Sequence, residues 1–231
     1  MLIISGIPIE VCKKNIKNMH LYVKPPNGRV MVSAPLSMSD EAIERFARTK
    51  ASWIRKQVAK FDNQLRQSER QYVSGETLYV WGKQYYLQTE SGNKNSLVLS
   101  GDKATLVVRK ESSSEQREKY VREWYRELLK TEVERLLPKW EKTTGLTVKN
   151  WQTKYMTTRW GTCNPNSGKI WINLQLAKKT PECLEYIILH ELIHLEEKSH
   201  NERFVSLMDM YMPMWREVKT KLNGQTLDHM E

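Results

Sequence analysis

The feature that most restricts how this chain can fold is the segment 190–200, which reads H-E-L-I-H-L-E-E-K-S-H. In an α-helix, His190 and His194 lie one turn apart on the same face, so both imidazoles can reach one ion at about 2 Å. Glu191 lies about 100° further around the helix, beside that ion and not bound to it. A carboxylate in this place can act as a base on a metal-bound water.

A third ligand, His200, is available only if the helix is interrupted. In an unbroken helix His200 would point about 240° away from His194 and lie about 9 Å further along the axis. Ser199 and Glu202 have the spacing of a capping box, which predicts that one helix ends near Lys198 and a new one begins at His200. Three protein ligands leave one position for water, as in catalytic zinc sites.

The alternative is a helix whose histidines are ordinary surface or core residues. Three of the five histidines fall inside eleven residues, and a separate apolar stripe would anchor the helix in the core: Leu184, Ile188, Leu192 and Leu195. We therefore favour the metal site. His20 and His229 have no neighbouring ligand residues and are not expected to bind a metal.

Apolar periodicity elsewhere predicts an α+β fold. A β-rich N-terminal region, 1–110, should contain a β meander (7–11, 19–23, 29–34), one helix from Asp40, and four strands (78–81, 85–87, 97–99, 106–108). The polar stretch 111–116 is the candidate linker. The second domain, 111–231, should contain a long helix in which Pro138 introduces a kink or an end, strands 147–156 and 169–174, and helices from Pro181 and His200.

Composition leaves a second class of function open. The 231 residues carry a net charge of +10, but residues 190–231 hold five Lys+Arg against eight Asp+Glu, which leaves +13 in residues 1–189. This charge and aromatics such as Trp81 and Tyr85 would suit a nucleic-acid-associated protein with a structural or regulatory metal, or a protease recruited to DNA. Filter binding against salt separates the two classes, since absence of affinity at low salt excludes this one.

The remaining composition excludes several environments. No secretory signal is recognisable, and no apolar run approaches the roughly 20 residues that span a bilayer, so we expect a cytoplasmic protein. Cys12, Cys163 and Cys183 lack the spacing of a disulfide framework or a thiolate zinc site, and we expect buried free thiols.

Five segments carry a resemblance to a known family. They are R-V-M-V-S-A-P (29–35), W-I-R-K (53–56), S-G-E-T-L-Y-V-W-G (74–82), R-W-G-T-C (159–163) and H-E-L-I-H…H-N-E-R-F (190–204). Along nearly its whole length the chain resembles the YgjP-like metallopeptidases. The resemblance implies a zincin-like fold and metal-dependent proteolysis, with zinc held by His190, His194 and His200 and with Glu191 as the base. Metzincins, which share the histidine spacing, have Gly at the position of Glu197, so the chain lies outside them.

The expected reaction is metal-assisted amide hydrolysis of a protein or peptide substrate. Zinc lowers the pKa of bound water from about 15.7 towards 7 and polarises the scissile carbonyl. Glu191 takes the proton of the water and returns it to the departing amine. Three residues are candidates for stabilising the oxyanion, and the sequence does not choose among them: Tyr155, Arg159 and Tyr211.

Weaker candidates surround this set. In zincins, which the chain resembles, a strand such as 169–174 often lies along the substrate, and an edge strand would bind extended peptide. The segment that contains Arg159, Trp160, Gly161 and Cys163 is predicted to be a structural β turn. The alternative is that these residues shape the cleft beside the metal. Possible partners of the histidine N–H groups are Glu196, Glu197, Glu202 and Asp209. The methionines of the last helix could line a floor beneath the metal, although helix core is the commoner place for such residues. They are Met208, Met210, Met212 and Met214.

Overall fold

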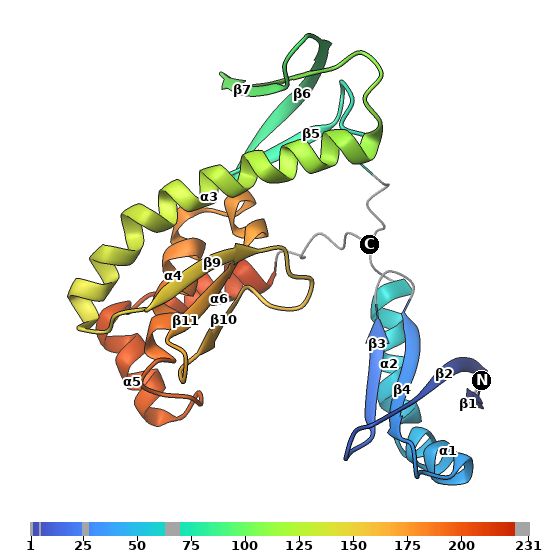
Figure 1. Cartoon of the computed structure of the whole chain (residues 1–231). Coiled ribbons are helices and arrows are strands. Elements are labelled where there is room, and N and C mark those ends of the chain that lie inside the picture. Colours follow the sequence, from blue (N-terminus) through green and yellow to red (C-terminus); the bar gives the residue numbers. More distant parts are fainter. Residues whose placement is uncertain (1, 5, 25–27, 63–69, 225–231) are drawn as a thin grey trace. The chain divides into compact units, whose positions relative to one another are not determined.

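The computed structural model describes residues 2–4, 6–24, 28–62 and 70–224 (Figure 1). The chain forms two compact units, Met1–Ser68 and Glu69–Asp228, and each has its own hydrophobic core. Strands dominate as far as Val108 and helices dominate after it, which confirms the α+β fold class. The division predicted between residues 110 and 111 falls inside the second unit and stays a prediction. Among the described residues, no helix is long and apolar enough to cross a membrane.

The first unit contains a four-stranded sheet and two helices. They are β1 (Leu2–Ile4), β2 (Ile7–Lys14), β3 (His20–Lys24), β4 (Arg29–Pro35), α1 (Asp40–Thr49) and α2 (Ala51–Asp62). The strand order is β1-β2-β4-β3 with β2 and β4 parallel, so the predicted meander is wrong. The parallel register places buried Ile9 opposite buried Val30, which local alternation cannot specify. The predicted single helix is two helices, which break at Lys50.

The second unit begins with another four-stranded sheet. Its strands are β5 (Thr77–Val80), β6 (Lys83–Ser91), β7 (Ser96–Ser100) and β8 (Lys103–Val108). Their order, β5-β6-β8-β7, repeats the topology of the first sheet, with β6 and β8 parallel. Leu78, Leu87 and Leu106 point to one face and are buried. The four predicted strands of this region are therefore confirmed, within a few residues at each end.

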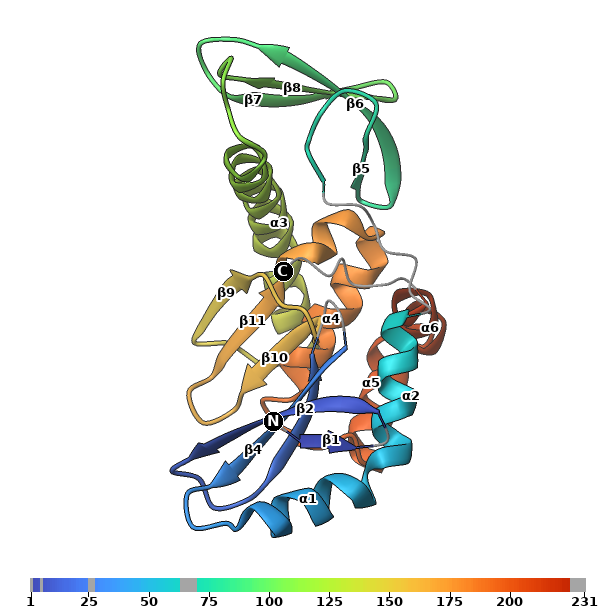
Figure 2. The same cartoon turned by 90° about the vertical axis from the view of Figure 1, so that its right-hand side faces the viewer.

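A single long helix, α3 (Ser114–Thr144), connects this sheet to the rest of the unit (Figures 1 and 2). Ser113 and Gln116 form a capping box at its start, and Gly145, at φ 74°, ends it. The helix continues through Pro138. At one end the Tyr125 hydroxyl donates to the Tyr79 carbonyl oxygen of β5 at 2.8 Å.

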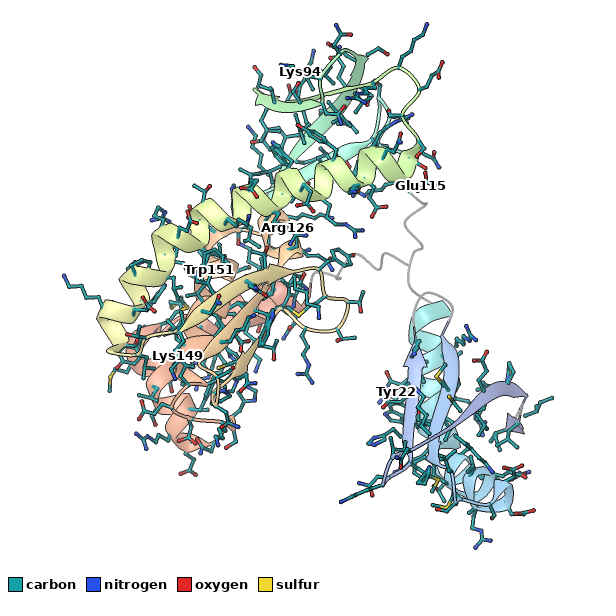
Figure 3. The ribbon with its side chains drawn as sticks, in the orientation of Figure 1. Tyr22, Lys94, Glu115, Arg126, Lys149 and Trp151 are labelled. Atoms are coloured by element: carbon teal, nitrogen blue, oxygen red, sulfur yellow. The ribbon has the colours of Figure 1, made fainter. Side chains whose placement is uncertain are left out.

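The other end of the second unit carries a three-stranded sheet and the remaining helices. They are β9 (Asn150–Lys154), β10 (Gly161–Asn164), β11 (Lys169–Asn173), the 3-10 helix η1 (Leu174–Lys178), α4 (Pro181–Ile193), α5 (Glu202–Tyr211) and α6 (Trp215–Asn223). Arg126, labelled with Trp151 in Figure 3, donates from Nη1 to the Thr153 carbonyl oxygen at 3.2 Å and so joins α3 to β9. The helix predicted from His200 to Leu222 is interrupted at Met212–Met214, where Pro213 cannot continue it.

The order of this sheet is β10-β11-β9. Strand β11 pairs with β10 on one side and β9 on the other, so its hydrogen-bonding groups are occupied on both sides. The prediction that 169–174 is the edge strand that receives a substrate is therefore wrong. The edge strands of this sheet are β10 and β9, and β10 is the one whose Gly161 approaches Glu191 of α4.

Candidate metal centre

Helix α4 carries His190 and Glu191 in its last turn, and His194 follows as its C-cap. Pro181 occupies its first turn after the N-cap residue Thr180, as predicted. Nine of its thirteen residues are buried, including Leu184, Ile188 and Leu192 of the predicted stripe. A helix packed on most sides cannot rotate without exposing this surface, so the positions of His190 and Glu191 in its last turn are fixed by the core.

The interruption between the two helices is present, although its details differ from the prediction. Helix α4 ends at Ile193, several residues before Lys198. The cap of α5 is Asn201, whose Oδ1 accepts from the Phe204 backbone N–H at 2.9 Å, and not Ser199. Both residue types cap helices well, so spacing alone could not distinguish them.

The interruption brings the three histidines together. Their Nε2 atoms are 3.2 Å apart for His190 and His194, 3.1 Å for His194 and His200, and 3.0 Å for His200 and His190. Two nitrogens on one tetrahedral zinc ion, each at about 2.0–2.1 Å, lie about 3.3 Å apart. The three imidazoles therefore fit a zinc ion, and they form the one cluster of this kind among the described residues.

The tautomer of His194 supports this fit. Its Nδ1 lies 2.9 Å from the Glu197 carbonyl oxygen, which can only accept, so Nδ1 carries the proton and Nε2 keeps a free lone pair. The His194 N–H therefore donates to a backbone carbonyl oxygen, and to none of the four carboxylates that the sequence offered as partners. Of these, Glu196 and Glu197 pair with Arg203, and Asp209 with Arg216. Within the described chain, the buried Nδ1 of His190 has no hydrogen-bond partner.

The aromatic ring of Phe204 packs against all three imidazoles. The ring centroid of Phe204 lies 5.0, 4.9 and 4.7 Å from those of His190, His194 and His200. Sequence reasoning missed this residue, although its position four residues after His200 was a usable signal. Of the methionines, for which helix core was the favoured place, Met208 lies in the core, whereas Met210 and Met214 are 68% and 58% exposed.

Two of the imidazoles, those of His190 and His200, are held in the neutral form that binds metals. Burial, followed by the neighbouring His194 and His200, lowers the pKa of His190 to about 3. Burial and then His194 also lower the pKa of His200. Protons therefore do not compete with a metal at these two nitrogens near neutral pH.

Glu191 lies beside the imidazoles in a confined space. Only 4% of its surface is exposed. A Cβ built on Gly161 of β10 would lie 2.5 Å from Glu191 Oε1 and 2.8 Å from Glu191 Cγ. Glycine at this position is therefore what admits the carboxylate. Burial raises the pKa of Glu191 to about 8, and the charge of Arg159 partly opposes this shift.

Comparison with known proteins identifies the family. The YgjP-like metallopeptidase domain matches residues 17–225. The chain belongs to this family. No curated protein matches the chain. Two solved metallopeptidase zymogens are similar over part of it: abylysin of Pyrococcus abyssi (20% identity, TM-score 0.38, 40% of this chain and 92% of that one) and jannalysin of Methanocaldococcus jannaschii (25%, 0.34, 42% and 94%).

In this YgjP-like metallopeptidase the R-W-G-T-C segment adjoins the site. Asn173 Nδ2 donates to the Arg159 and Met156 carbonyl oxygens at 2.7 and 2.8 Å, and Gln175 Nε2 donates to Met156 at 2.9 Å. Both amides are buried and fix the backbone before β10. Of the three oxyanion candidates, Arg159 interacts electrostatically with Glu191. Tyr155 lies under the Arg122 guanidinium at 4.8 Å.

The free edge of β10 passes this site. The Asn173 N–H donates to the Trp160 carbonyl oxygen at 2.9 Å, which marks that pair as hydrogen-bonded. Because such pairs alternate in an antiparallel ladder, the N–H and C=O groups of Gly161 and Cys163 point away from β11. The metallopeptidase therefore presents unpaired strand groups next to its buried glutamate. All three cysteines are free thiols, but only Cys183 is buried, so the predicted burial is wrong for Cys12 and Cys163. Partial burial raises the pKa of Cys163 to about 12.

Proposed function

We propose that the chain is a zinc-dependent peptidase with His190, His194 and His200 as the metal ligands and Glu191 as the general base. The observation that carries the proposal is the convergence of three imidazole Nε2 atoms within 3.2 Å beside a buried carboxylate. Three protein ligands are typical of a catalytic zinc site, and a structural site normally has four.

The metal, Glu191 and the outer edge of β10 have separate roles in the proposed amide hydrolysis. Zinc, when bound, supplies Lewis-acid polarisation of the scissile carbonyl and acidifies water. Glu191 accepts the proton of the attacking water and returns it to the leaving amine. Its burial disfavours the ionised form, but a positive charge at the adjacent imidazoles would lower its pKa and favour the base. The unpartnered outer groups of Gly161 and Cys163 hold an extended substrate by main-chain hydrogen bonds.

Removal of the metal tests this function directly. The zinc-loaded protein should hydrolyse an unfolded substrate such as casein at neutral pH, and dialysis against a chelator should abolish cleavage. Addition of one equivalent of zinc should restore it. Mass spectrometry of the fragments distinguishes hydrolysis at peptide bonds from loss of intact protein by precipitation. Cleavage that persists in chelator would rule out the proposed mechanism.

The contact between Gly161 and Glu191 gives a sharper test of the geometry. Gly161→Ala should keep its zinc but lose activity about a hundredfold, because a displacement of the base by about 1 Å has an effect of this size. The new Cβ would also lie 2.8 Å from Ile187 Cγ2, and the expected loss comes from these contacts, since Gly161 does not have a positive φ.

The matched control for that variant is Gly224→Ala at the end of α6. A Cβ there approaches no atom closer than 3.4 Å, so activity should stay unchanged. Equal activity of Gly161→Ala and the parent would show that Glu191 need not occupy the observed position.

A second proposal concerns recruitment. Residues 1–68 contain twelve Lys+Arg and five Asp+Glu, and the same unit exposes the aromatic rings of Tyr22 and Trp53. Tyr22 is labelled in Figure 3. Excess positive charge with exposed aromatics suits nucleic acid. Weak association of this unit with DNA or RNA would bring the peptidase to its substrates and leave the assignments in the second unit unchanged.

A further inference from the structure

The segment that forms the substrate-side sheet has an unusual charge. Residues 143–180 contain six basic residues and no aspartate or glutamate. They are Lys149, Lys154, Arg159, Lys169, Lys178 and Lys179. Helix α3 has a different composition, since it carries both charges and its Arg122, Arg126 and Arg135 pair with glutamates of the same helix. The sheet that contains β10 therefore lacks carboxylates of its own to neutralise it.

Arg159 is the basic residue of this set that lies nearest the reaction. Its charge acts on Glu191, which places the two side chains close together. It precedes Gly161 by two residues, and the Trp160–Asn173 hydrogen bond shows that the ladder already extends to Trp160. A Cβ on Gly161 would lie 2.5 Å from Glu191 Oε1, and two residues span at most about 7 Å, so the Arg159 side chain begins close to this carboxylate.

The backbone of Arg159 is fixed while its side chain is open to solvent. Asn173 Nδ2 donates to its carbonyl oxygen at 2.7 Å from a fully buried amide. The Arg159 side chain is exposed, and no carboxylate among the described residues forms an ion pair with it. A guanidinium with a fixed attachment and no ion pair of its own is prepared to bind an external carboxylate, because less freedom is lost on binding.

We propose that Arg159 selects substrates with aspartate or glutamate close to the cleaved bond. An extended peptide paired with the outer edge of β10 directs alternate side chains to the face of Glu191 and Arg159. A carboxylate there meets the guanidinium in a charge-assisted, geometrically specific pair. The specificity rests on the proposed peptidase function and names the chemical class of substrate for the same site.

Cleavage-site profiling of the full-length, zinc-loaded protein tests this selection. A peptide library derived from a digested proteome is incubated with the parent, Arg159→Gln and Arg159→Glu, and the new termini are identified by mass spectrometry. The parent should enrich Asp and Glu at one position within three residues of the cleaved bond. For matched synthetic peptides, exchange of that residue for Asn or Gln should lower kcat/KM about tenfold or more.

The variants separate specificity from a structural role. Arg159→Gln should lose the acidic preference, and Arg159→Glu should change it to Lys and Arg. A matched control is Arg109→Glu, an exposed arginine after β8 with the same change in charge, which should keep the parental profile. An acidic preference that survives in Arg159→Glu, or a parent without any acidic preference, overturns the proposal. A parent that holds zinc and cleaves no peptide overturns the peptidase function itself, and the selection with it.

Discussion

Glu191→Gln should reduce the rate of peptide hydrolysis about a hundredfold to ten-thousandfold, because an amide cannot accept the proton of the attacking water. Glutamine has nearly the same size as glutamate and fits the space beneath Gly161. Zinc content should stay at one ion per chain, since Glu191 is not among the three proposed ligands. Burial opposes the charged form of Glu191, so the neutral amide should leave the melting temperature unchanged or slightly higher.

The control for this variant lies on the same helix. Glu185 of α4 pairs with Lys139 at 3.3 Å and points about 140° away from His190 around the helix. Glu185→Gln makes the same chemical change and should cleave at the parental rate. Steady-state assays with zinc determination on each sample give both quantities. A Glu191→Gln protein as active as the parent would exclude Glu191 as the base.

His200→Ala should lose most of its bound zinc and, with it, detectable hydrolysis. His200 supplies one of the three converging Nε2 atoms and comes from the segment before α5, whereas the other two come from α4. Removal of this nitrogen leaves two ligands, fewer than the catalytic zinc sites of proteins use. Metal analysis of protein purified without chelator measures the occupancy.

His20→Ala is the appropriate comparison for this loss. His20 is an exposed histidine of β3 that stacks on Tyr22 at a centroid distance of 6.2 Å. It belongs to the other compact unit, and its removal should leave the zinc content intact. Equal zinc in His200→Ala and the parent would remove His200 from the set of ligands.

Local patterns predicted the secondary structure better than the pairing of strands. The strands of the first sheet were placed almost correctly, but the parallel pairing of β2 with β4 joins residues some twenty positions apart, such as Ile9 and Val30. Alternation identifies which face of a strand is buried and carries no information about its neighbours. The same limit explains why β11 was assigned to the sheet edge that β10 occupies.

The candidate site was accessible from sequence because its chemistry lies within eleven residues. The helical turn between His190 and His194 and the interruption before His200 follow from local geometry. The contributions of Phe204, Gly161 and Asn173 do not, because each depends on a contact between different elements. The cap at Asn201 was missed for a third reason, since Ser199 satisfies the same local rule.

The close approach of β10 to α4 has a consequence for relatives of this protein. The space that a methyl group would occupy at Gly161 is taken by the Glu191 side chain and by Ile187 Cγ2, so a side chain at that position would displace the proposed catalytic group. A relative with all three histidines but a larger residue there should be a pseudoenzyme that binds zinc without hydrolysing peptides. One backbone position on a strand thus separates catalytic members from metal-binding ones whose H-E-x-x-H segments are identical.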